Sequence, residues 1–171
     1  WGKNLARVFH GLGILKAICE SSEEILLIQA AQYPDVDTTT SFDEILASPD
    51  INAIALATPA EKHYLMAKKA LLAGKHVFVE KPLSITAQEG EDLVKIAKQR
   101  GKVLFVGHIL QYHPAVKIVK RMLQDGELGK LQYIYSNRLN LGKIRREENI
   151  LWSFAPHDIS VILSLVGKEP I

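Results

Sequence analysis

The sequence has only one cysteine, Cys19, so no disulfide forms within the chain. Cys19 ends an apolar stretch, residues 14–19, and we expect it to be a small buried hydrophobic residue rather than a nucleophile or a metal ligand. The sequence also lacks an apolar run approaching the roughly 18 to 20 residues that cross a bilayer, and residues 1–4 lack the pattern of a signal peptide. We therefore expect no membrane partner and a cytoplasmic location.

The sequence also has no large excess of positive or negative charge. The chain has 21 basic and 19 acidic residues, a formal net charge of +2, and no block of like charge long enough to act as a binding arm. Nucleic acid is therefore not an expected partner. The composition, 47% hydrophobic over 171 residues, is that of an ordinary globular protein with a core of normal size.

Short apolar runs alternate with segments of helical spacing along most of the chain. Strands are predicted at residues 14–19, 53–57, 76–79 and 103–107. Helices are predicted at residues 2–12, 23–31, 42–46, 60–73, 87–100, 114–124 and 157–166. This alternation is typical of an α/β fold with a doubly wound parallel sheet of the Rossmann type.

The pattern changes after the helix predicted at residues 114–124. Residues 131–140 mix polar and apolar side chains and predict a longer strand, a single strand of what is expected to be a larger antiparallel sheet. We therefore expect a partial dinucleotide-binding domain over residues 1–115. Residues 116–171 are expected to form the start of a second, α+β domain.

Polar residues follow each predicted strand. They are Glu20, Thr58 with Pro59, Glu80 with Lys81, and His108. Because ligands of doubly wound sheets bind outside the carboxyl ends of the strands, we expect these residues to line one crevice. A carboxylate at Glu20 would accept hydrogen bonds from the adenosine ribose hydroxyls and repel a 2′-phosphate, which favours NAD over NADP. The alternative for Glu20, with equal support, is a solvated acid ahead of the helix that starts at Glu23.

The segment 57–83 carries the most specific motifs of the chain. They are Ala57-Thr58-Pro59, His63, Ala67, Ala70-Leu71, Gly74-Lys75-His76 and Glu80-Lys81-Pro82. With this spacing the chain resembles the glucose-fructose oxidoreductase/inositol dehydrogenase (Gfo/Idh/MocA) family. Segments 107–108, 112–115, 138–142 and 155–160 resemble, within that family, the UDP-N-acetylglucosaminuronate 3-dehydrogenase-like branch.

The resemblance implies an NAD-dependent dehydrogenase that takes hydride from a sugar hydroxyl. It implies that Lys81 lies beside the nicotinamide and that His157, on the first turn of the last helix, faces it from the second domain. A base is needed within about 2.6 to 3.2 Å of the hydroxyl oxygen, and a lysine accepts a proton at neutral pH only when its pKa falls from roughly 10.4 to near 7 or 8. His157 is therefore the expected base, and Lys81 is expected to polarise the oxygen. The alternatives are a solvated loop lysine and an N-cap histidine.

The other expected site residues follow from the same resemblance and, for Glu20 and His108, from their places after predicted strands. The residues expected to bind NAD are Gly2, Asn4, Glu20, Thr58, Pro59, His63, Glu80, Lys81 and His108. The expected contacts of a sugar or nucleotide-sugar substrate are Tyr112, Arg138 and Asn140. No metal site is expected. The second domain is expected to bind substrate and to build a homodimer or a tetramer, since an unfinished sheet leaves an unpaired edge.

Two features of the chain depart from the family pattern. Ser153 stands where the family usually has an aspartate one helical turn before the histidine, and a serine cannot hold or stabilise a protonated imidazole by charge. Of the glycine fingerprint Gly-x-Gly-x-x-Gly only Gly2 remains, without its strand. We therefore expect the chain to be shortened at both ends, with the central strand of the sheet missing. A non-catalytic dinucleotide-binding regulatory protein and an inactive fragment remain as alternatives.

Overall fold

The computed structural model of the chain describes residues 1–137, 139 and 150–168, except for the side chains of residues 150, 151 and 153. It divides into two compact units, Trp1–Val106 and Gly107–Ile171. The predicted boundary between domains 1–115 and 116–171 stays a prediction. Each unit is described by itself below.

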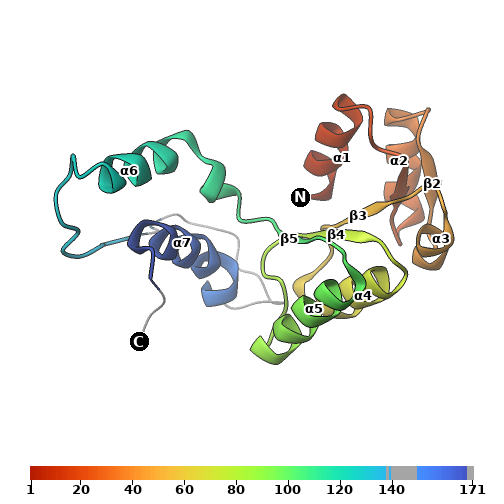
Figure 1. The fold of residues 1–171 in the computed structure, drawn as a ribbon. Helices are drawn as coiled ribbons and strands as arrows, with labels where there is room; N and C mark the ends of the chain where they lie inside the picture. Colours follow the sequence, from red (N-terminus) through yellow and green to blue (C-terminus); the bar gives the residue numbers. More distant parts are fainter. Residues whose placement is uncertain (138, 140–149, 169–171) are drawn as a thin grey trace. The chain divides into compact units, whose positions relative to one another are not determined.

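The first unit alternates helices with short strands, as the sequence predicts (Figure 1). Its helices are α1 (Gly2–Gly11), α2 (Glu23–Gln32), α3 (Phe42–Ala47), α4 (Ala60–Leu72) and α5 (Ala87–Arg100). Its strands are β1 (Ala17–Cys19), β2 (Asp37–Thr39), β3 (Ala53–Leu56), β4 (His76–Val79) and β5 (Leu104–Val106). The sequence missed only β2, whose polar residues lack the apolar pattern of a buried strand.

The strands of this unit form two separate parallel sheets. β1 pairs with β2, and β4 pairs with β3 on one side and β5 on the other. The parallel α/β architecture is confirmed. β1 thus lies at an edge of the two-stranded sheet, and β3 lies at an edge of the three-stranded sheet.

Local signals in the sequence fix the helix ends. The side chain of Ser41 accepts a hydrogen bond from the backbone of Glu44 and caps α3. Thr86 and Glu89 form a full capping box at the start of α5, which ends at Gly101 in the left-handed conformation with φ 61°. These caps explain why both ends of α5 could be predicted to the residue.

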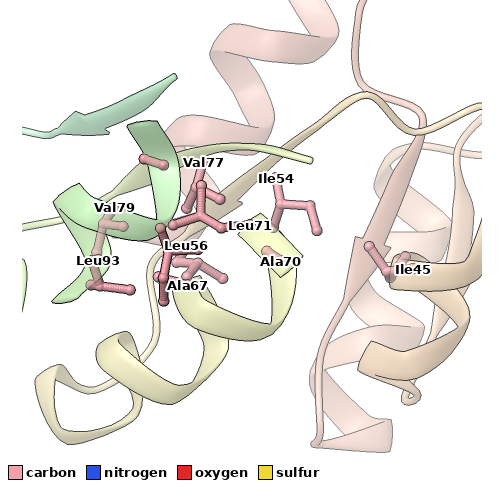
Figure 2. Close-up of a cluster of buried hydrophobic side chains, with 11 residues drawn as sticks. Ile45, Ile54, Leu56, Ala67, Ala70, Leu71, Val77, Val79 and Leu93 are labelled. Carbon is pink, nitrogen blue, oxygen red and sulfur yellow. The ribbon is translucent and has the colours of Figure 1, made fainter. Parts of the chain in front are cut away.

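The main core lies between the sheet β3-β4-β5 and the helices α4 and α5 (Figure 2). Leu71 of α4 and Leu93 of α5 are fully buried, as are Val77 and Val79 of β4. Each such side chain contributes about 1.5 to 3 kcal/mol by leaving water. The core therefore holds β3 and β4, whose carboxyl ends carry the candidate site, in a fixed relation to each other.

The prediction that Cys19 is buried was wrong. The residue is exposed, and β1 buries none of its side chains fully. The helix α2, which follows β1, contains no buried residue either. The two-stranded sheet is thus covered far less than the sheet β3-β4-β5, which explains the exposure of Cys19.

The regular secondary structure described in the second unit is all helical. It contains a 3₁₀ helix η1 (Ile109–Tyr112), α6 (Pro114–Gln124) and α7 (Ile150–Val166). The prediction of a strand at residues 131–140 was wrong for residues 131–137, which form no strand. Residues 138 and 140 lie outside the described residues. The side chains of Tyr133 and Tyr135 are 82% and 79% exposed, so no described element covers these two tyrosines.

The last helix begins earlier than predicted. α7 starts at Ile150, contains Pro156 in its interior, and places His157 in its middle rather than on its first turn. Proline is common in a first helical turn and rare in an interior, so a start near His157 was the natural expectation. Among the described residues, no helix has both the length and the apolar character that crossing a membrane requires.

Lys75 stabilises the first unit from a buried position. It is 8% exposed, and its ammonium donates hydrogen bonds to the carbonyls of Ser48, at 2.6 Å, and Ile51, at 2.7 Å. It thereby joins the loop before β3 to the start of β4.

Lys75→Met is expected to lower the free energy of unfolding by about 2 kcal/mol, because two partly buried carbonyls lose a charged donor. Urea denaturation checks this, with the exposed Lys95→Met as the control; an equal loss in both variants would contradict the role.

Candidate functional site

The carboxyl ends of β3 and β4 lie side by side. Leu56, the last residue of β3, pairs with Val79, the last residue of β4, and the Glu80 amide donates a hydrogen bond to the Leu56 carbonyl at 2.9 Å. Thr58 follows β3 by two residues, and Glu80 and Lys81 follow β4 directly. The structure therefore places these three residues next to one another, beyond the carboxyl ends of β3 and β4. The predicted crevice that also includes Glu20 and His108 stays a prediction.

Unsatisfied polar atoms occur at this edge. Within the part of the chain that the structure describes, the buried atoms Thr58 Oγ1 and Glu80 Oε1 have no hydrogen-bond partner. A buried polar group without a partner is costly, and such groups concentrate where a ligand binds. A hydroxyl can donate a hydrogen bond to a phosphate of a dinucleotide, and a carboxyl oxygen can accept one from an amide or a ribose hydroxyl.

The start of α1 adjoins the same edge. A Cβ placed on Gly2 would lie 3.7 Å from the Cβ of Ala57, the residue between β3 and Thr58. The amides at the amino terminus of a helix favour anions such as a pyrophosphate. Gly2 and Asn4, both on the first turn of α1, thus stay in the candidate site, Gly2 exposed and Asn4 half-buried.

Trp1 is a site residue that the sequence did not reveal. Burial raises the pKa of the Glu80 carboxyl above its ordinary value, and hydrogen bonds from the Lys81 backbone and the Trp1 side chain act in the opposite direction. Neither composition nor spacing points to Trp1, because its contact with Glu80 depends on how α1 packs. The net effect is a carboxyl that is harder to ionise than in water.

The raised pKa of Glu80 predicts a pH-dependent stability. Glu80 is protonated in both the folded and the unfolded state below the ordinary pKa of 4.5, and it ionises less readily in the folded state as the pH rises. The ionised carboxylate therefore costs stability at neutral pH. Glu80→Gln is expected to raise the free energy of unfolding at pH 7 and to leave it nearly unchanged at about pH 3. Denaturation at both pH values checks this, with the exposed Glu91→Gln on α5 as control; a destabilised variant at pH 7 would contradict it.

Glu20 makes local contacts at the start of α2. Its carboxylate accepts hydrogen bonds from the Ser22 amide, at 3.1 Å, and from the Ser21 hydroxyl, at 3.3 Å. Ser22 is the N-cap of α2. This geometry matches the alternative of an acid ahead of a helix, while the role of Glu20 towards a ribose stays a prediction.

His63 lies below the surface rather than on it. The side chain is 1% exposed, and its two ring nitrogens face the backbone carbonyls of Thr58 and Pro82. Pro59, the N-cap of α4, is exposed beside them. The histidine thus contacts the two loops that carry the site.

The second unit holds the remaining predicted residues. His108 is half-buried, burial lowers the pKa of its imidazole, and its buried Nδ1 has no partner within the described residues. Tyr112 is 57% exposed, with the Lys117 ammonium 5.4 Å from its ring centre. Arg138 and Asn140 lie outside the described residues.

His157 is half-buried on α7, and its carbonyl accepts a hydrogen bond from the Ser160 hydroxyl. The neighbouring Asp158 accepts a hydrogen bond from the Ser136 hydroxyl at 3.1 Å. His157 and Lys81 belong to different units, so their meeting at one substrate stays a prediction. The described residues contain no group of histidine, cysteine and acidic side chains that could hold a metal ion.

The parallel sheet β3-β4-β5, its flanking helices and the polar carboxyl ends of its strands define a Rossmann-type dinucleotide-binding domain. Residues 3–108 match the family model described as "Oxidoreductase family, NAD-binding Rossmann fold". The chain belongs to this family of NAD-binding oxidoreductases, the Gfo/Idh/MocA family.

Two curated relatives illustrate the family. The chain is 32% identical over 132 residues to UDP-N-acetylglucosamine 3-dehydrogenase of Acidithiobacillus ferrooxidans, covering 77% of the chain and 40% of the relative. It is 29% identical over 153 residues to scyllo-inositol 2-dehydrogenase (NADP(+)) IolW of Bacillus subtilis, covering 85% and 41%.

The fold is also similar to a solved structure with bound ligands. This is the WlbA dehydrogenase from Bordetella pertussis in complex with NADH and UDP-GlcNAcA, with a TM-score of 0.64, 29% identity, and coverage of 68% of the chain and 33% of that structure. The chain spans less than half the length of each of these relatives.

Proposed function

We propose that the chain is part of an NAD-dependent dehydrogenase that oxidises a ring hydroxyl of a sugar, specifically a nucleotide-linked amino-sugar uronate. The observation that carries the proposal is the edge formed by the ends of β3 and β4, where Thr58, Glu80 and Lys81 gather and where two buried polar atoms have no partner within the described residues. Thr58, Glu80 and the start of α1 would hold the dinucleotide. The bound dinucleotide supplies a nicotinamide ring that accepts hydride.

The residues of the chain would handle the hydroxyl. Lys81, half-buried at the end of β4, would place its ammonium at the hydroxyl oxygen and stabilise the negative charge that develops there. His157 would accept the hydroxyl proton as the general base. The carbon–hydrogen bond then breaks with both electrons leaving as hydride, and the carbon becomes a carbonyl.

The nucleotide sugar is the preferred substrate on two grounds. Segments 107–108, 112–115 and 155–160 have the pattern of the UDP-N-acetylglucosaminuronate 3-dehydrogenase-like branch. UDP-N-acetylglucosamine 3-dehydrogenase and the complex with UDP-GlcNAcA are among the proteins that the chain resembles. Glu20 supports NAD over NADP, since a carboxylate beside the ribose repels a 2′-phosphate.

The experiment is an absorbance assay for reduced nicotinamide with NAD and a panel of UDP-N-acetylglucosamine, its uronate and inositol. We expect reduction of NAD with the uronate and little with inositol. Calorimetric titration with NAD and NADP separately measures binding, with NAD expected to bind more tightly. Turnover of inositol alone would overturn the choice of substrate.

A non-catalytic dinucleotide-binding regulatory protein is the second candidate, and Ser153 favours it. If NAD binds and no sugar is oxidised even by Ser153→Asp, the dehydrogenase proposal fails and the second candidate stands.

Assembly is a separate proposal: we expect a homodimer or tetramer built through the second unit, which light scattering tests.

A further inference from the structure

His63 is the most completely buried polar side chain of the first unit, and both of its ring nitrogens are engaged. It projects from the first turns of α4 and is 1% exposed. Nδ1 lies 2.6 Å from the carbonyl oxygen of Pro82, and Nε2 lies 2.8 Å from the carbonyl oxygen of Thr58. One imidazole thus joins a loop that follows β3 to a loop that follows β4.

Both partners of the ring are acceptors only. A backbone carbonyl has no proton to donate, and a proline has no N–H. A neutral imidazole has a single N–H, so one of its nitrogens would direct a lone pair at a carbonyl oxygen across a buried contact. The imidazolium has an N–H on each nitrogen and satisfies both carbonyls.

We propose that His63 is held as a buried imidazolium that fastens the Thr58–Pro59 turn to the Glu80–Lys81–Pro82 loop and so sets the spacing of the dinucleotide-binding residues. The functional part of this inference rests on the proposed function. His63 is then a positioning residue, because its ring nitrogens contact backbone rather than the ligand.

The two hydrogen bonds of the buried His63 ring favour its charged form. Burying a cation is costly unless its protons are paired, and here two charge-assisted hydrogen bonds pair both of them. Replacing the ring leaves at least one buried carbonyl without a donor, which is the costly case.

The first test needs no substitution. Nitrogen-15 NMR of the histidine rings, recorded on the whole chain at pH 7.5, distinguishes a nitrogen that carries a proton from one that does not. We expect a directly bonded proton on both nitrogens of His63. One protonated and one unprotonated nitrogen in the His63 ring would overturn the proposal.

The second test measures the positioning role with His63→Gln. A glutamine amide has one nitrogen and cannot reach both carbonyls, so the backbone amide resonances of residues 58–62 and 80–83 are expected to shift or broaden while those of α2 stay in place. His10→Gln, at a half-buried histidine of α1 that contacts Asp35, is the matched control. Unchanged resonances of both loops in His63→Gln would overturn the positioning role.

NADH titration connects this role to the proposed function. His63→Gln is expected to weaken NADH binding on the order of tenfold, and His10→Gln is expected to leave it unchanged. If the wild-type chain binds NADH and His63→Gln binds it equally tightly, the functional part of the inference is overturned. If the wild-type chain binds no NADH, the proposed function fails for this chain, while the two NMR results still decide whether the ring is charged and whether it fastens the loops.

Discussion

Lys81→Met is expected to lower the rate of sugar oxidation by about a hundredfold to a thousandfold, the largest effect of any single substitution at the end of β4. Methionine keeps the length and much of the volume of the side chain but has no charge to stabilise the developing oxyanion. The loss is expected in kcat, because the charge develops only in the transition state. The measurement is the rate of NAD reduction over a range of sugar concentrations.

The matched control is Lys95→Met, an exposed lysine on α5 that lies away from the strand ends. It is expected to oxidise the sugar at the wild-type rate. Calorimetry with NAD should give a dissociation constant for Lys81→Met within a few fold of wild type. Wild-type kcat in Lys81→Met would mean that the lysine is a solvated loop residue.

His157→Gln is expected to lower kcat by about a hundredfold to ten-thousandfold, because the amide hydrogen-bonds but cannot take the proton of the hydroxyl. NAD binding is expected to be unchanged, since His157 lies on α7 and the dinucleotide-binding residues lie mainly in the first unit. Stopped-flow absorbance of the first turnover measures the chemical step directly.

The control for this substitution is His10→Gln. The His10 side chain is half-buried on α1 and contacts Asp35. Equal rates in His157→Gln and wild type would show that another group accepts the proton. Asp158, already bonded to Ser136, would then be the next residue to replace.

The first unit could be predicted from the sequence because its signals are local. The bounds of β4 and α5 match their predictions, since Gly74, Thr86 and Gly101 mark the turns and caps around them. β2 could not be predicted, because pairing with β1, and not any apolar pattern of its own, makes residues 37–39 a strand. The prediction that Cys19 is buried failed because burial depends on which elements cover β1, and the local sequence does not show this.

The second unit shows where local signals end. Residues 131–137 have a strand-like pattern, yet a strand forms only where a partner strand pairs with it, and none does so among the described residues. α7 extends to Ile150 through Pro156, against the preference of proline for the first turn.

The candidate site was predictable as a set of strand ends and less so in its contacts. Thr58, Glu80 and Lys81 meet because parallel neighbouring strands end at the same edge. The bridge from His63 to the carbonyls of Thr58 and Pro82 spans 5 and 19 residues of sequence, so it exists only once α4 and β4 have packed. The contact of Trp1 with Glu80 is likewise a consequence of packing.

The most direct measurement is a crystal structure of the chain with NADH and the sugar uronate. We predict that the nicotinamide ring lies between Lys81 and His157, with the oxidisable oxygen within about 2.6 to 3.2 Å of a nitrogen of each. Lys81 and His157 directed into separate regions of solvent, with the ring in contact with neither, would contradict the proposed chemistry.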